Sequence, residues 1–178
     1  MKRNIKVILS YDGKNYSGWQ IQSKDRTVQG EFEHSLKKLL KKDVRITPAG
    51  RTDSGVHANG QVINFHTDNM SIPDTKFATA LNSLLPQDIR CLDSTQVHSD
   101  FHARYSALNR IYKYKIINGR PAYPYEMQYA LFQKNFVKIR ELNKLASVLV
   151  GTHDFTSFSA VRDPHENKVR TITSSYFY

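Results

Sequence analysis

The chain has 178 residues, of which 39% are hydrophobic and 24% charged, so a folded protein of one ordinary or two small domains is favoured over a disordered one. Lysine and arginine total 26 against 16 acidic residues, a formal net charge of +10, which is typical of proteins with a polyanionic partner. A merely soluble basic protein is the alternative, and charge alone gives nucleic-acid binding roughly even odds. A membrane span, a convincing signal peptide and an intrachain disulfide are not indicated, and the single cysteine, Cys91, fits a reducing cytoplasm, where we expect the protein.

The first predicted element is a buried strand over residues 5–11, which is followed by the turn signal Asp12-Gly13. Residues 27–42 predict an amphipathic helix, because apolar side chains recur there at three- and four-residue spacing. Thr27 could be its N-cap, but Gly30 stands where a capping box has Glu or Gln, so the start of this helix is less well defined.

Two short strands are predicted next, over residues 44–47 and 62–66. A second helix is predicted over residues 74–85, where Pro86 marks its end, and a strand over residues 89–97. The order β-α-β-β-α-β is the ferredoxin-like pattern, so we expect an α+β fold with a mainly antiparallel sheet.

The rest of the chain predicts part of a second, similar α/β unit. At least one strand is expected within residues 104–118, a helix over 137–150 and a strand over 169–178. Gly151 is a natural C′ residue for that helix. We therefore expect an N-terminal α/β domain over residues 1–100 and an incomplete second domain over residues 101–178.

The positive charge is concentrated in residues 101–120, which contain five basic residues, no acidic residue and interleaved tyrosines: Arg104, Arg110, Lys113, Lys115 and Arg120, with Tyr105, Tyr112 and Tyr114. Basic groups can neutralise phosphates while tyrosine rings stack on unpaired bases. An edge strand is the alternative interpretation, because tyrosine is a good strand former and lysine protects strand edges. The composition alone does not separate RNA binding from an edge strand.

The stretch AGRTDSGVHANG, residues 49–60, is a glycine-rich turn between two predicted strands. Gly50 and Gly55 flank Asp53 and permit positive φ or a close backbone approach. Arg51 could pair with the Asp53 carboxylate and keep it ionised, as a nucleophile or base requires. The alternative is an Asx-turn, in which the aspartate bonds its own backbone.

Metal and cofactor sites have weak support in the sequence. His98 and His102 have a zinc-type spacing only on a helix, and no third ligand is apparent near them. Ser54 and His57 lack a nucleophile-elbow pattern, and neither common phosphate-binding glycine loop occurs. We therefore expect no metal and no nucleotide cofactor.

The turn resembles the active-site motif of the tRNA pseudouridine synthase A (TruA) family. Further stretches match that family in the same order along the chain: YDGKNYSGWQIQ, TVQGEFEHSL, LNSLLPQDI, DFHARYSA, RIYKY and GTHDFTSF. The resemblance covers essentially the whole chain, and several spaced motifs in one order are far more specific than a single turn.

The resemblance implies isomerisation of uridine to pseudouridine in the anticodon stem-loop of tRNA, at positions 38, 39 and 40, without a cofactor or metal. The catalytic residue is expected to be Asp53, which attacks the flipped-out uridine or removes a proton from its ribose. Tyr112 is expected to contact the target base, and Arg51 to orient Asp53 or bind a phosphate. Lesser RNA contacts are expected at Arg104, Arg110 and His57, and the family suggests a homodimer.

Members of the family continue into an apolar segment of the type F-L-x-x-M-[VI]-R, whose arginine pairs with the catalytic aspartate. The 178 residues contain no such segment. We therefore expect either that the chain is part of a longer protein or that it is inactive alone. A non-catalytic RNA-binding relative is the alternative function.

Overall fold

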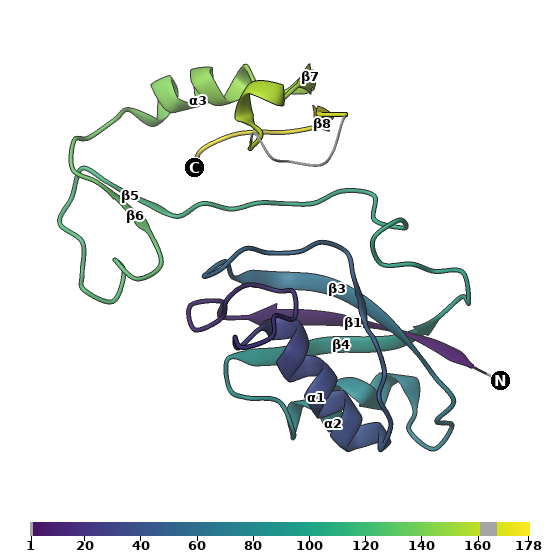
Figure 1. The fold of residues 1–178 in the computed structure, drawn as a ribbon. Helices are drawn as coiled ribbons and strands as arrows, with labels where there is room; N and C mark the ends of the chain where they lie inside the picture. The colour runs from purple at the N-terminus through teal and green to yellow at the C-terminus, as the bar shows by residue number, and fades with distance from the viewer. Residues whose placement is uncertain (1, 161–166) are drawn as a thin grey trace. The chain divides into compact units, whose positions relative to one another are not determined.

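The structure is a computed structural model that describes residues 2–160 and 167–178. The chain divides into two compact units, Met1–Arg110 and Ile111–Tyr178 (Figure 1). The first unit thus continues past residue 100, where the sequence predicted a domain boundary.

The first unit is built on a four-stranded sheet with the order β2-β3-β1-β4. Its strands are β1 (Arg3–Tyr11), β2 (Thr47–Pro48), β3 (Ala58–Thr67) and β4 (Ile89–Val97). Every neighbouring pair is antiparallel, with Val7 opposite Ile63 on one side and Ser94 on the other. This order is that of a ferredoxin-like fold, so the predicted fold class is confirmed.

The predicted strand over residues 44–47 is displaced in the structure. Only Thr47 and Pro48 pair with β3, and the preceding Ile46 donates its backbone N–H to the Glu33 carboxylate at 3.3 Å. Arg45 pairs with the same carboxylate at 2.9 Å. A side chain of the neighbouring helix therefore satisfies a backbone group that the prediction assigned to the sheet.

Two helices cover one face of this sheet (Figure 1). Helix α1 spans Val28–Leu40, and the Thr27 hydroxyl accepts a hydrogen bond from the Gly30 N–H at 3.3 Å, so the predicted N-cap is confirmed. A 3-10 turn at Asp74–Lys76 leads into α2, which spans only Phe77–Asn82. The predicted helix over 74–85 was too long at both ends.

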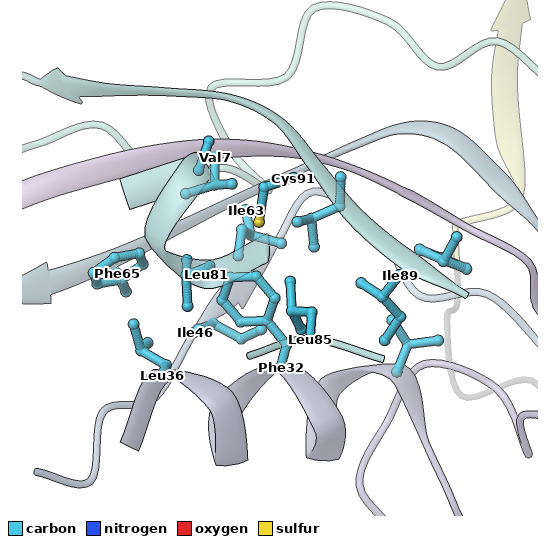
Figure 2. Packing of buried hydrophobic residues seen from close by; sticks show 14 of the residues in the cluster. Val7, Phe32, Leu36, Ile46, Ile63, Phe65, Leu81, Leu85, Ile89 and Cys91 are labelled. Atoms are coloured by element: carbon cyan, nitrogen blue, oxygen red, sulfur yellow. The ribbon is translucent and has the colours of Figure 1, made fainter. Parts of the chain in front are cut away.

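The core lies between the helices and the sheet, as Figure 2 shows. Phe32 and Leu36 reach from α1 toward Ile63 and Phe65 of β3, and all four side chains are almost fully buried. Cys91 of β4 belongs to the same core, and burial raises the pKa of its thiol to about 12. The thiol is therefore neutral at physiological pH and acts as an apolar core group.

Two buried asparagines of the sheet's other face explain why the first unit extends past residue 100. Asn4 donates to the carbonyls of His98 at 3.0 Å and Phe101 at 2.9 Å. Asn64 donates to the Asn4 side chain at 2.9 Å and accepts from the Ala103 N–H at 2.9 Å. These bonds fix the segment after β4 to the sheet, because buried polar groups are costly when left unpaired.

The second unit contains two small sheets and one helix. β5 (Ile116–Asn118) pairs in parallel with β6 (Leu131–Gln133), α3 spans Ile139–Ser147, and β7 (Gly151–Asp154) pairs antiparallel with β8 (Val169–Ile172). A short 3-10 turn occupies Thr156–Phe158.

The elements of the second unit are shorter than the sequence predicted. Among its described residues, Ile117 and Ala146 are the buried hydrophobic side chains, so little packing extends the strands and the helix. The sequence predicted Gly151 as the residue that ends the helix, but α3 ends at Ser147 and Gly151 does not follow it directly. Gly151 is instead the first residue of β7, with a φ of 117°, a backbone conformation that residues other than glycine rarely adopt.

Candidate active site

The Asp53 turn joins β2 to β3 at one end of the first unit's sheet. The Val56 N–H donates to the Asp53 carbonyl at 3.2 Å and closes the turn, and Gly55 adopts a φ of 78°. Asp53 itself is exposed to solvent. The turn therefore presents the carboxylate outward while the backbone carries the local hydrogen bonds.

The backbone on both sides of the aspartate is held by the segment that follows β1. The Trp19 N–H donates to the Thr52 carbonyl at 2.9 Å. The Tyr16 carbonyl accepts two bonds, one from the Gly55 N–H and one from the Ser54 hydroxyl, each at 3.2 Å. The position of the aspartate is thus fixed by a segment far away in the sequence.

Two glycines allow that segment to lie against the turn. A Cβ atom on Gly13 would lie 1.9 Å from the Val56 carbonyl oxygen, which no side chain can tolerate. A Cβ atom on Gly18 would lie 2.9 Å from the Thr52 carbonyl oxygen, and the φ of Gly18 is 89°. The sequence did not predict this role of Gly13 and Gly18, although both glycines stand in the stretch YDGKNYSGW.

Tyr11 and His57 add side-chain contacts to the turn. The Tyr11 and Thr52 hydroxyls are 2.8 Å apart, and burial raises the pKa of Tyr11, so its phenol stays protonated. His57 Nδ1 lies 3.0 Å from the Asp12 carboxylate and accepts from the Gly13 N–H at 3.1 Å. His57, predicted as an RNA contact, thus packs on the segment after β1 while remaining partly exposed.

The ion pair suggested between Arg51 and Asp53 is not present in this geometry. Within the described part of the chain, neither side chain has a hydrogen-bond or ion-pair partner, and both are exposed. An ion pair between two exposed groups contributes little, so the backbone of the turn decides where each side chain lies. Both remain available to a bound ligand.

Arg110 lies against the start of the turn. Its guanidinium donates to the Ala49 carbonyl at 2.7 Å and to the Arg104 carbonyl at 3.4 Å. Arg104 extends its own guanidinium over the Tyr105 ring, with the guanidinium carbon 5.8 Å from the ring centre. Both arginines are predicted RNA contacts, and Arg110 is the one that holds the start of the turn through the Ala49 carbonyl.

Tyr112 belongs to the second unit, where its side chain is 77% exposed. The first unit thus brings together Asp53, Arg51, His57 and Arg110, and the contact of Tyr112 with the target base stays a prediction. Among the residues that the structure describes, no group of three or more His, Cys, Asp or Glu could hold a metal ion, and no helix is long and apolar enough to cross a membrane.

Comparison with known proteins identifies the class to which this fold and turn belong. The family model described as tRNA pseudouridine synthase matches residues 7–106, which include the whole Asp53 turn. The chain is 43% identical to tRNA pseudouridine synthase A of Treponema denticola over 99% of its length and 68% of that protein. It is 43% identical to tRNA pseudouridine synthase A of Halalkalibacterium halodurans over 97% of its length and 65% of that protein.

The chain therefore belongs to the tRNA pseudouridine synthase family, as the ordered motifs of its sequence predicted. A third relative, tRNA pseudouridine synthase A of Bacillus pumilus, is 45% identical over 94% of the chain and 68% of that protein. The chain spans about two thirds of the length of the curated relatives it matches.

Proposed function

We propose that the protein isomerises uridine to pseudouridine in the anticodon stem-loop of tRNA, at positions 38, 39 and 40, with Asp53 as the catalytic carboxylate. The observation that carries this proposal is the turn itself, in which three backbone and side-chain bonds fix the neighbours of Asp53 while its carboxylate stays exposed and unpaired within the described residues. The names of the relatives support tRNA as the substrate.

The reaction needs no atom beyond those of the substrate and no redox step. The bond between C1′ and N1 breaks, the uracil turns, and a bond forms between C1′ and C5; the hydrogen on C5 leaves as a proton, and N1 ends with one. Asp53 either attacks the uridine or removes a proton from the ribose. Both routes require a carboxylate close to the ribose, which the exposed turn can supply.

A uridine within a stem-loop must leave the stack to reach Asp53. We propose that the exposed ring of Tyr112 contacts the flipped base, and that Arg51 binds a phosphate or orients Asp53 once RNA is bound. Arg104, Arg110 and His57 are proposed as further RNA contacts. By family resemblance, we also propose that the protein is a homodimer of the cytoplasm and works without a cofactor.

Tritium release tests the proposal. The protein is incubated with tRNA that carries tritium at C5 of uridine, and tRNA binding is measured in parallel. Release of tritium is the expected result, because C5 loses its hydrogen isotope when it forms the bond to C1′. Tight tRNA binding without release would overturn the proposed activity and favour the alternative, a non-catalytic RNA-binding relative.

Arg104 allows a separate test of RNA binding. We expect Arg104→Ala to reduce the slope of log affinity against log salt by about 1, because one phosphate contact is lost. Its rate on bound tRNA should stay close to that of the unchanged protein. Arg110→Ala is the comparison: because that guanidinium also holds the Ala49 carbonyl, the rate on bound tRNA should fall as well. An unchanged salt slope would remove Arg104 from the phosphate contacts.

A further inference from the structure

The side chains of Tyr16, Arg26 and Asp88 form a polar cluster, and the Tyr16 backbone contacts the Asp53 turn. The Tyr16 hydroxyl donates to the Asp88 carboxylate at 2.5 Å. The Arg26 guanidinium donates to both oxygens of that carboxylate, at 3.0 and 3.3 Å, and its central carbon lies 4.4 Å from the centre of the Tyr16 ring. Three separate segments of the first unit therefore meet at one carboxylate.

Backbone bonds join the same segments. The Asp12 N–H donates to the Asp88 carbonyl, and the Ser17 N–H donates to the Arg26 carbonyl, each at 2.9 Å. The stretch between β1 and α1 is thus fixed at two points on either side of Tyr16. The cluster holds this stretch in one conformation, although the stretch contains neither helix nor strand at this point.

Tyr16 connects the cluster to the turn. Its side chain is buried beneath Arg26, with a relative exposure of 2%, while its carbonyl accepts the bonds from Ser54 and Gly55 on the C-terminal side of Asp53. A shift of the Tyr16 ring would therefore shift its carbonyl and the two hydrogen bonds that this carbonyl accepts from the turn. Neither the sequence motifs nor the comparisons assign a role to this tyrosine.

The protonation states favour strong bonds in the cluster. Burial raises the pKa of Tyr16, and the nearby Asp88 carboxylate raises it further, so the phenol stays protonated and can donate. Burial alone would raise the pKa of Asp88, but the hydrogen bonds from Tyr16 and Arg26 outweigh it and hold the pKa below its usual range. Asp88 is therefore ionised at neutral pH, and its hydrogen bonds are charge-assisted.

We propose that Tyr16 is a positioning residue for Asp53: held by Arg26 and Asp88, it sets through its carbonyl where the catalytic turn lies. This inference rests on the proposed function, because positioning matters only if Asp53 reacts with the uridine. A displacement of about 1 Å at a reacting group can slow a reaction by about 100-fold, so a partial loosening of the cluster should slow the chemical step more than it weakens tRNA binding.

Tyr16→Phe and Asp88→Asn test the inference with little change of shape. Tyr16→Phe removes the hydroxyl that donates to Asp88. Asp88→Asn removes the negative charge and one of the two oxygens that accept from Tyr16 and Arg26. We expect each variant to lower the single-turnover rate of tritium release about tenfold, with tRNA affinity changed by less than about twofold. The double variant should be no more than about twofold slower than Asp88→Asn, because the loss of the carboxylate charge already weakens the bond that Tyr16→Phe removes.

Asp68→Asn is the matched control. Asp68 also accepts from a cation, Lys42 at 2.9 Å, but the pair lies at the opposite end of β3 from the turn. Its rate should stay within about twofold of the unchanged protein, as expected for an exposed ion pair. Thermal unfolding of every variant shows whether it is folded when its rate is measured.

Hydrogen exchange of the Gly55 amide gives a readout that needs no substrate. The Gly55 N–H bonds to the Tyr16 carbonyl, so its exchange should accelerate in Tyr16→Phe and Asp88→Asn and stay unchanged in Asp68→Asn. If the protein without substitutions released no tritium, the proposed function would be overturned. An active protein whose Tyr16→Phe and Asp88→Asn variants keep both the full rate and the Gly55 protection would overturn the positioning role.

Discussion

We expect Asp53→Asn to lower the single-turnover rate of tritium release by at least about 10,000-fold and to change tRNA affinity by less than about threefold. Asparagine has nearly the shape of aspartate but neither attacks the uridine nor takes a proton. The turn should survive the change, because its bonds run through the backbone of Thr52 and Gly55 and through the Ser54 hydroxyl rather than through the Asp53 carboxylate. The loss is therefore chemical rather than structural.

The matched control for this experiment is Asp43→Asn. Asp43 is an exposed acid of the same unit and pairs with Lys37 at 2.9 Å, close to the end of α1. Its replacement should leave the rate within about twofold, because an exposed ion pair contributes little. If Asp53→Asn kept a rate comparable to that of Asp43→Asn, Asp53 would not be the catalytic residue.

We expect Gly13→Ala to lower the rate of tritium release by at least about 100-fold and the free energy of unfolding by about 2–4 kcal/mol. The added Cβ would lie 1.9 Å from the Val56 carbonyl oxygen, so either the segment after β1 or the turn must move. The obstacle is backbone rather than a flexible side chain, and movement of the turn changes the position of Asp53. Urea unfolding and single-turnover tritium release measure the two effects.

Gly60→Ala provides the comparison for Gly13→Ala. The new Cβ on Gly60 would have Ile8 Cγ2 as its nearest neighbour, at 4.0 Å, which is ordinary van der Waals contact. Gly60 lies in β3 of the same unit, so its replacement by alanine adds the same methyl group without a clash. A Gly13→Ala variant as stable and as active as Gly60→Ala would show that the close approach is unimportant.

The elements that the sequence predicted best are those whose own side chains determine them. β4 has the predicted bounds, 89–97, and α1 begins after the predicted N-cap, because apolar spacing and capping are local properties. The strand predicted over 44–47 was displaced because Glu33 of α1 takes the Ile46 N–H. That bond joins residues far apart in the sequence, and no local pattern reveals it.

The candidate site was predictable to a lesser extent. The residues of the turn alone allowed two interpretations of Asp53, a structural turn residue or a catalytic carboxylate. The family resemblance favoured the catalytic carboxylate. Gly13, Gly18 and Tyr16 were not identified, because each acts on the turn through a contact that exists only in the folded protein. The RNA contact of Arg110 stays a prediction, and its bond to the Ala49 carbonyl was not predicted, because it joins residues far apart in the sequence.

The most direct test of the central claim is to map pseudouridine in tRNA treated with the protein. Two transcripts are compared, one with uridine at positions 38, 39 and 40 and one with cytidine at all three, and the Asp53→Asn variant is run beside the unchanged protein. Pseudouridine should form in the first transcript alone, within these positions, and only with the unchanged protein. Pseudouridine elsewhere in both transcripts, or equal formation by Asp53→Asn, would contradict the account.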